Sequence, residues 1–202
     1  MTATLLQTRP TTRRIWPRVA ADTRYVLTGL PLAVASFTVC LTVATAGLTL
    51  ALVWVGLPLL VVAATLARGF ATSERARLSG LGERLPAPAY GESRRVLAVL
   101  TDRQSWRDLT HAILRFIPST FSSALVLSWW AGVIGSATFA VWGWSLPDGP
   151  HDSDLPQLLG LGESYLVAVG FYAVVALVLT ATLPIVTRFA ARLEAGFARA
   201  LL

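Results

Sequence analysis

The sequence predicts an all-α integral membrane protein, a four-helix bundle built from two repeated transmembrane hairpins with amphipathic interfacial helices. Three observations lead to this fold class. Hydrophobic residues make up 54% of the chain and charged residues only 14%, against about 25% charged residues in a typical soluble domain. The mean hydropathy is +0.62. Long uncharged stretches alternate with arginine-rich ones along the chain.

The first transmembrane hairpin is predicted over residues 25–67, an uncharged stretch between Arg24 and Arg68. A bilayer core about 30 Å thick needs about 20 apolar residues of helix. The stretch is therefore long enough for two spans joined by a very tight turn, which we expect near Gly47. Because arginine flanks both ends, both ends should lie on the same side of the membrane.

The second transmembrane hairpin is predicted over residues 116–187, with an exterior loop over 145–163. This loop is acidic and contains no arginine, which places it outside the cell. Trp142 and Trp144 fit an aromatic belt at the outer interface, and Trp54 should sit at the same level.

Arginines fill the remaining segments, which we expect to be cytoplasmic. All 17 basic residues are arginine and the net charge is +6. They flank apolar spans rather than forming a solvated basic patch, so contact with lipid headgroups is expected and nucleic acid is not. The sequence thus predicts a multi-pass protein of the cell membrane with both termini cytoplasmic. Its cytoplasmic parts are an arm (1–24), a basic loop with interfacial helices (68–115) and a tail (188–202).

One interfacial helix should begin at about Ser93, with Trp106 on its apolar side. Arg103, Arg107 and His111 point away from that side. This pattern is typical of a membrane-surface helix with snorkelling arginines.

Two sets of small or hydroxyl residues recur at helical spacing inside the spans. Such residues are the usual material of helix–helix contacts in membranes, so we interpret both sets as packing faces. A polar permeation path is the alternative for the first set, and either a contact inside the bundle or a homodimer seam is open for the second. The first set is Thr38, Thr42, Thr45 and Thr49, and the second includes Ser128, Gly132 and Ser136.

The exterior loop is the only segment with a pattern that suggests a ligand. Its carboxylates and imidazole could hold a cation weakly or respond to pH, although a short acidic loop is ordinarily just solvated. These residues are Asp148, His151, Asp152 and Asp154. The sequence has no zinc-ligand spacing, nucleophile elbow or phosphate-binding loop, so neither a catalytic residue nor a cofactor is expected.

An internal repeat relates the two hairpins. The stretches that open them, 27–37 and 113–123, each carry an early proline and follow an aspartate. The stretches 56–74 and 182–194 likewise share a proline and a closing glutamate. We interpret this as a parallel pseudo-repeat of two hairpins of the same polarity.

Five short stretches of the sequence resemble the sensor domain family of actinobacteria, a membrane region usually found N-terminal to histidine kinases. They are SWRDLTHAILRFIP (105–118), the two GLPL repeats (29–32 and 56–59), ARGFATSERARL (67–78) and RFAARLEAGFARALL (188–202). The resemblance implies a sensor module that acts with a histidine kinase or another cytoplasmic signalling protein. In the kinases a phosphoacceptor region and an ATP-binding domain follow. Here the chain stops at Leu202, and neither His111 nor His151 has a phosphoacceptor context.

The functional prediction is a membrane sensory or regulatory module that lacks its own kinase domain. It would relay a membrane or envelope signal to a separate cytoplasmic partner, through a shift in helix packing. A small transporter or channel subunit is the alternative, although the spans lack the charged groups that coupled transport usually needs. An assembly scaffold that dimerises through Ser128, Gly132 and Ser136 is a third hypothesis.

Overall fold

The computed structural model describes residues 15–82, 86, 88, 90, 97–146 and 155–202, and within them every regular element is a helix. Five long helices form the body: α1 (Ile15–Leu50), α2 (Gly56–Gly80), α4 (Arg103–Leu114), α5 (Phe116–Ala137) and α8 (Tyr165–Leu201). Short helices connect them: η2 (Ala51–Val53), α3 (Ala98–Thr101), α6 (Phe139–Trp142), η3 (Gly143–Ser145) and α7 (Leu155–Leu158).

Within the part of the chain that the structure describes, four helical segments are long and apolar enough to cross a membrane. They are Ile15–Val53, Gly56–Gly80, Arg103–Ala137 and Tyr165–Leu201. The prediction of an all-α chain with four membrane-type helices is therefore confirmed at this level. Helix α2 continues without a break to Gly80, well beyond Arg68.

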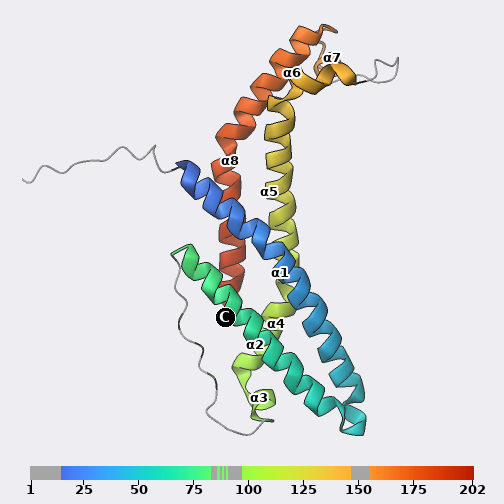
Figure 1. Ribbon diagram of the computed structural model, residues 1–202, viewed down its shortest axis with the longest axis vertical. Coiled ribbons are helices and arrows are strands. Elements are labelled where there is room, and N and C mark those ends of the chain that lie inside the picture. The colour runs from blue at the N-terminus through green and yellow to red at the C-terminus, as the bar shows by residue number, and fades with distance from the viewer. Residues whose placement is uncertain (1–14, 83–85, 87, 89, 91–96, 147–154) are drawn as a thin grey trace, which may run out of the picture.

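The two hairpins extend in opposite directions from a central crossing (Figure 1). Hairpin 1, formed by α1 and α2, turns at one end of the molecule, and hairpin 2, formed by α5 and α8, turns at the other end. The expectation of two hairpins of the same polarity is thus not confirmed, and in this arrangement Trp54 lies at the end opposite Trp142. The reason lies in the segment before hairpin 2. Helix α4 runs almost straight into α5, with the Ser119 amide donating to the Arg115 carbonyl at 3.1 Å, and α4 packs along α1 and α2.

The turn of hairpin 1 lies beyond the position predicted for it. Helix α1 continues through Gly47 to Leu50, and the chain reverses at Trp54, whose φ of 64° is left-handed. Gly47 serves close packing instead of a turn. A Cβ on Gly56 would lie 2.1 Å from the Gly47 carbonyl oxygen, so the two helices approach closely only because both positions are glycine.

Small residues form most of the contact surface between the helices. The buried face of α1 consists of Val26, Gly29, Ala33, Ser36, Cys40, Ala44 and Gly47, at spacings of three or four residues. Two apolar clusters result. One joins α1, α2 and α4 around Cys40, Ala67 and Ala112, and the other joins α1, α2, α5 and α8 around Val26, Leu78, Val126 and Ala191. Small side chains let helix backbones approach closely, and this brings the polar residues of the crossing together.

Candidate functional site

A buried carboxylate marks the point where the two hairpins cross. On α2, Ala67, Ala71, Glu74 and Leu78 follow one another at helical spacing, so all four lie on one face. That face packs against α1 and α4, and Glu74 is only 1% exposed. A buried charge must be paired and hydrogen-bonded, and Glu74 is.

Three side chains from three elements surround the Glu74 carboxylate. The Tyr25 hydroxyl donates to Oε1 at 2.7 Å, and Arg77 Nη1 donates to Oε2 at 2.6 Å. Arg115 Nη2 lies 2.8 Å from Oε2, within ion-pair distance but without hydrogen-bond alignment. The other end of Arg77 donates to the Tyr25 carbonyl, and its guanidinium lies 4.6 Å from the centre of the Tyr25 ring.

A second buried carboxylate, Glu194 of α8, faces the same group. Glu194 is 4% exposed and accepts a hydrogen bond from the Ser119 hydroxyl at 3.3 Å, while its Oε2 has no hydrogen-bond partner among the described residues. A Cβ on Gly29 would lie 2.8 Å from Glu194 Oε2 and 2.9 Å from Arg77 Nη2. Because Gly29 has no side chain, it leaves space for Arg77 of hairpin 1 and Glu194 of hairpin 2 to lie close to each other.

We call this group the ion network, and it consists of Tyr25, Glu74, Arg77, Arg115, Ser119 and Glu194. It contains two carboxyl groups and two guanidinium groups. It connects α1, α2, the junction between α4 and α5, and α8. Removing one partner of a buried ion pair costs about 3–5 kcal/mol, because the remaining charge is left uncompensated. The network therefore favours one register of the two hairpins over others.

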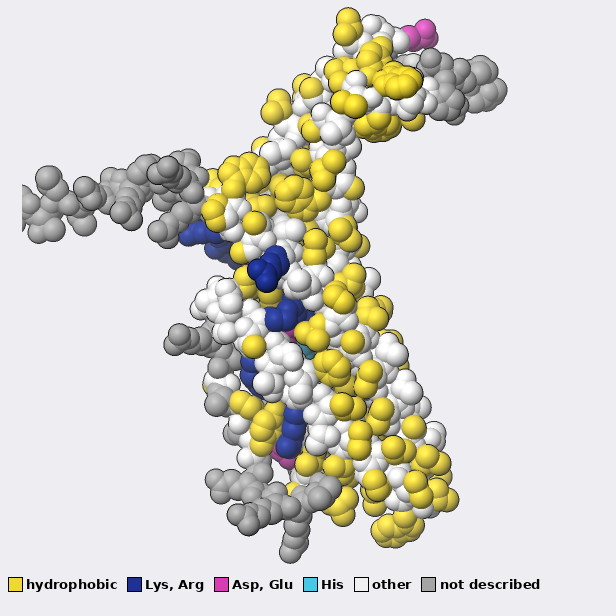
Figure 2. Space-filling model, viewed as in Figure 1, with side chains coloured by type: hydrophobic (Ala, Val, Ile, Leu, Met, Phe, Trp, Pro, Cys, Tyr) yellow, Lys and Arg dark blue, Asp and Glu magenta, His cyan; other side chains and the backbone are white. Residues whose placement is uncertain are grey.

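A second polar layer lies between α2 and α4, next to the ion network. Asp108 is fully buried and accepts hydrogen bonds from the Tyr90 hydroxyl at 2.7 Å and from Gln104 Nε2 at 2.8 Å. Arg75 Nη2 lies 3.9 Å from it. Burial raises the pKa of Tyr90, and the hydrogen bond to Asp108 raises it further. Figure 2 shows basic side chains in separate patches over the middle and lower part of this face, while the upper part, formed by hairpin 2, is mainly apolar or white.

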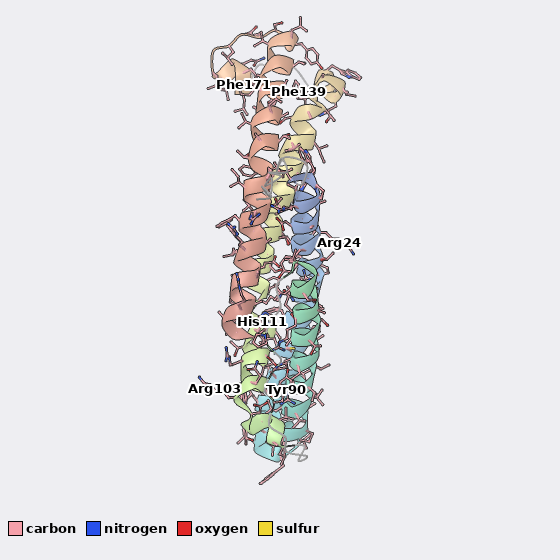
Figure 3. The ribbon with its side chains drawn as sticks, turned by 90° about the vertical axis from the view of Figure 1, so that its left-hand side faces the viewer. Arg24, Tyr90, Arg103, His111, Phe139 and Phe171 are labelled. Carbon is pink, nitrogen blue, oxygen red and sulfur yellow. The ribbon has the colours of Figure 1, made fainter. Side chains whose placement is uncertain are left out.

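His111 lies inside the molecule rather than on its surface. It is 1% exposed, its ring stacks on Phe197 at 5.9 Å between centroids, and neither ring nitrogen has a hydrogen-bond partner among the described residues. Figure 3 shows it between the helices, while Arg103 projects outward. The surface-helix interpretation is thus wrong for α4, because its buried side carries Ser105, Asp108 and His111 while Trp106 is 45% exposed.

The end of α8 is held by one arginine of α2 and one of α4. Arg75 Nη2 donates to the Leu202 carbonyl at 2.9 Å, and Arg107 Nη2 donates to the Ala200 carbonyl at 3.1 Å. Cations near a helix C-terminus are favourable because the last carbonyls lack partners within the helix. A change in the packing of α2 or α4 would consequently move the end of α8.

Most of the predicted packing residues lie on the exposed faces of the helices and not in the contacts between helices. All four residues of the threonine set are exposed, and the buried face of α1 lies beside them. In the second set Ser128 is exposed, while Gly132 and Ser136 are half-buried. A Cβ on Gly132 would lie 2.9 Å from Leu179 Cδ1, so this glycine faces α8. The candidate loop ligands Asp148, His151, Asp152 and Asp154 lie outside the described residues.

Sequence reasoning did not find the ion network, although part of the signal was present. Glu74 and Glu194 each interrupt an alanine-rich helical face, and a charge on such a face is a signal of a buried partner. Their partners come from helices far away in the sequence, and only the tertiary arrangement identifies these. Among the described residues, no group of three or more His, Cys, Asp or Glu side chains could hold a metal ion.

The fold and the site define the class: an all-helical protein with four membrane-type helices whose two hairpins meet at buried ion pairs. The family model described as Putative sensor matches residues 25–202, so the chain belongs to this family. No curated protein and no solved structure matches the chain.

Proposed function

We propose that this protein is a non-catalytic membrane sensory module that relays a membrane or envelope signal to a separate cytoplasmic partner. Membership of the sensor family and the four membrane-type helices support the general class. The relay to a histidine kinase or another cytoplasmic signalling protein is the finer part of the proposal.

One observation supports this proposal above the others: the ion network joins the two hairpins at a single buried point. Buried interfaces tend to be bistable rather than continuously deformable, so small changes there favour one discrete packing over another. A condition that alters how one hairpin sits in the membrane would strain the pairing of Glu74 with Arg115. The end of α8, which Arg75 and Arg107 hold, would carry the change to the partner.

Site-specific photo-crosslinking in the native cell tests the partner directly. A photoreactive residue at Arg103, which projects outward from α4, should crosslink to an identifiable histidine kinase or signalling protein. The same residue at Leu52, which is 90% exposed at the turn of hairpin 1, serves as the control and should not. The proposal is contradicted if a photoreactive residue crosslinks to a signalling protein neither at Arg103 nor at the exposed Arg199 on α8.

We also propose that the arginine-rich segments face the cytoplasm and that both termini lie there, in the cell membrane. This topology places both hairpin turns on the outer side, whereas the turns lie at opposite ends in Figure 1. Cysteines introduced at Leu52 and Trp144 in a Cys40→Ala background discriminate the two arrangements with a membrane-impermeant thiol probe. Labelling of both from outside supports the topology and contradicts the opposed packing of the hairpins seen in Figure 1. Labelling from opposite faces refutes it.

The two hairpins, we propose further, are copies of one repeated unit. The buried residues Ala67, Ala71, Glu74 and Leu78 of α2 match Thr187, Ala191, Glu194 and Ala198 of α8, each pair separated by 120 positions. Replacing residues 67–78 with the sequence of residues 187–198 should therefore preserve folding. Loss of the fold in this chimera, to the same degree as with a scrambled insert, would contradict the repeat.

The transporter or channel alternative receives no support from the threonine set. A permeation path needs polar groups that line a passage between helices. The four threonines lie on the outer face of α1 instead, and Thr49 donates to its own helix at the Thr45 carbonyl.

A further inference from the structure

A cleft of about 280 Å³ lies between the first turns of α1 and the last third of α8. Its lining is formed by Arg18, Asp22, Leu81, Arg188, Ala191, Arg192 and Ala195. Arg18 and Asp22 are four residues apart on α1, and Arg188 and Arg192 are four residues apart on α8. Each pair therefore lies on one side of its helix.

The cleft carries an excess of positive charge that the protein does not neutralise. Three guanidinium groups line it together with one carboxylate, Asp22. Arg18, Arg188 and Arg192 are all exposed, and none of them makes a hydrogen bond or an ion pair to another described residue. The Asp22 carboxylate interacts electrostatically with all three, but one negative charge cannot balance three positive ones. Elsewhere in the described part, Arg77 and Arg115 are paired with carboxylates. The three arginines are thus available to an anion.

The cleft lies at the level where headgroups would meet the protein. Arg188 is the first charged residue after the uncharged stretch 164–187 of α8, so the cleft begins where an apolar helix segment ends. Trp16, near the start of α1, is 57% exposed. An exposed tryptophan beside arginines at the end of an apolar span is typical of the membrane–water interface.

We propose that this cleft binds the phosphate group of an anionic phospholipid. Guanidinium groups match phosphate oxygens with paired N–H donors, and three of them offer more donors than one phosphate accepts. Ala191 and Ala195 are buried at the base of the cleft, and their small side chains leave room for the headgroup. The site is separate from the ion network, although Glu194 lies between these alanines on α8. The inference concerns where a phosphate binds and does not depend on which signal follows.

Native mass spectrometry of the full chain in detergent tests the site by titration with phosphatidylglycerol, with phosphatidylcholine as the neutral-headgroup comparison. The double substitution Arg188→Gln/Arg192→Gln should weaken phosphatidylglycerol binding about 25-fold, at about fivefold for each arginine near a lipid phosphate. The matched control Arg24→Gln/Arg103→Gln removes the same charge from two exposed arginines outside the cleft. It should change binding less than about threefold, because these side chains do not reach the bound phosphate.

The substitution Asp22→Asn gives a readout that misfolding cannot mimic. Removing the one carboxylate of the cleft should strengthen phosphatidylglycerol binding several-fold, since it repels the phosphate. Equal losses in the cleft and control variants would overturn the proposal, as would unchanged binding in Asp22→Asn. A parallel titration with inorganic phosphate distinguishes the source of the ligand. Weak phosphate binding supports a lipid site, whereas inorganic phosphate binding as tight as phosphatidylglycerol would refute lipid as the ligand.

Discussion

Removal of the Glu74 carboxylate should destabilise the fold strongly. In Glu74→Leu, Arg115 remains 4% exposed and loses the carboxylate at 2.8 Å, and Tyr25 loses its acceptor. An uncompensated buried charge costs about 3–5 kcal/mol. For a chain of this size, each kcal/mol lost from the free energy of unfolding lowers the melting temperature by about 2–4 °C. The melting temperature should therefore fall by about 10 °C.

The single cysteine provides the assay. Cys40 is fully buried, so a fluorogenic thiol dye reacts with it only when the helices separate. Dye fluorescence during a thermal ramp in detergent therefore reports unfolding without an added label. Asp102→Asn is the control: its ion pair with Arg68 is less enclosed, and asparagine keeps the cap on α4. That variant should lose only about 1 kcal/mol.

A double substitution separates the charge from the packing. In Glu74→Leu/Arg115→Met both charged groups are replaced by apolar side chains, and such replacements of buried pairs are often neutral or stabilising. The double variant should therefore be more stable than Glu74→Leu alone by about 2 kcal/mol or more. The reasoning is refuted if the double variant is less stable than either single variant, or if Glu74→Leu melts no lower than Asp102→Asn.

Three further substitutions test close contacts by the same thermal assay. Gly29→Ala should destabilise by about 1–3 kcal/mol, because the added Cβ would lie 2.8 Å from Glu194 Oε2; a melting temperature at or above that of the parent chain would contradict this. Gly69→Ala should raise stability by about 0.5–1 kcal/mol, since its added Cβ meets nothing within 4 Å and alanine favours the helix; a loss of stability would count against the packing described for α2. Gly56→Val should prevent hairpin 1 from closing, because even a Cβ there would lie 2.1 Å from the Gly47 carbonyl oxygen. Dye reaction with Cys40 in Gly56→Val well below the melting temperature is the expected result, and full protection would contradict it.

The sequence was sufficient to predict the membrane-type helices, because their signal is local. The uncharged stretch 25–67 has the length of two spans, and the arginines that bound it mark where they end. The tight turn was misplaced because a glycine serves equally as a turn residue and as a contact without a side chain. At Gly47 the second use applies.

The sequence could not be used to predict that the two hairpins point in opposite directions. The positive-inside rule counts arginines by position and treats each as exposed to water. Arg77 and Arg115 are instead paired inside the molecule with Glu74. An arginine that neutralises a buried carboxylate looks the same in the sequence as one that contacts a headgroup. The difference appears only when helices distant in the sequence are brought together.

The ion network illustrates the same limit at the level of the site. The helical face of α2 showed that Glu74 follows buried alanines, which is a local observation. Tyr25 and Arg115 contact the Glu74 carboxylate only because their helices meet at the crossing. They lie 49 and 41 positions away from Glu74 in the sequence, and these separations do not indicate a contact. Gly29 opens the first GLPL repeat, but its packing role could not be predicted, because that role depends on Glu194 of α8.

The central claim, that the ion network determines how the two hairpins pack, is tested most directly by a distance between them. Spin labels at Thr28 on α1 and Phe189 on α8, both exposed, report the crossing in a Cys40→Ala background by pulsed electron paramagnetic resonance. A control pair at Val34 and Val62 lies within hairpin 1. The account predicts that Glu74→Gln shifts or broadens the first distance distribution and leaves the second unchanged. Identical first distributions in the parent chain and Glu74→Gln, with both proteins folded, would contradict it.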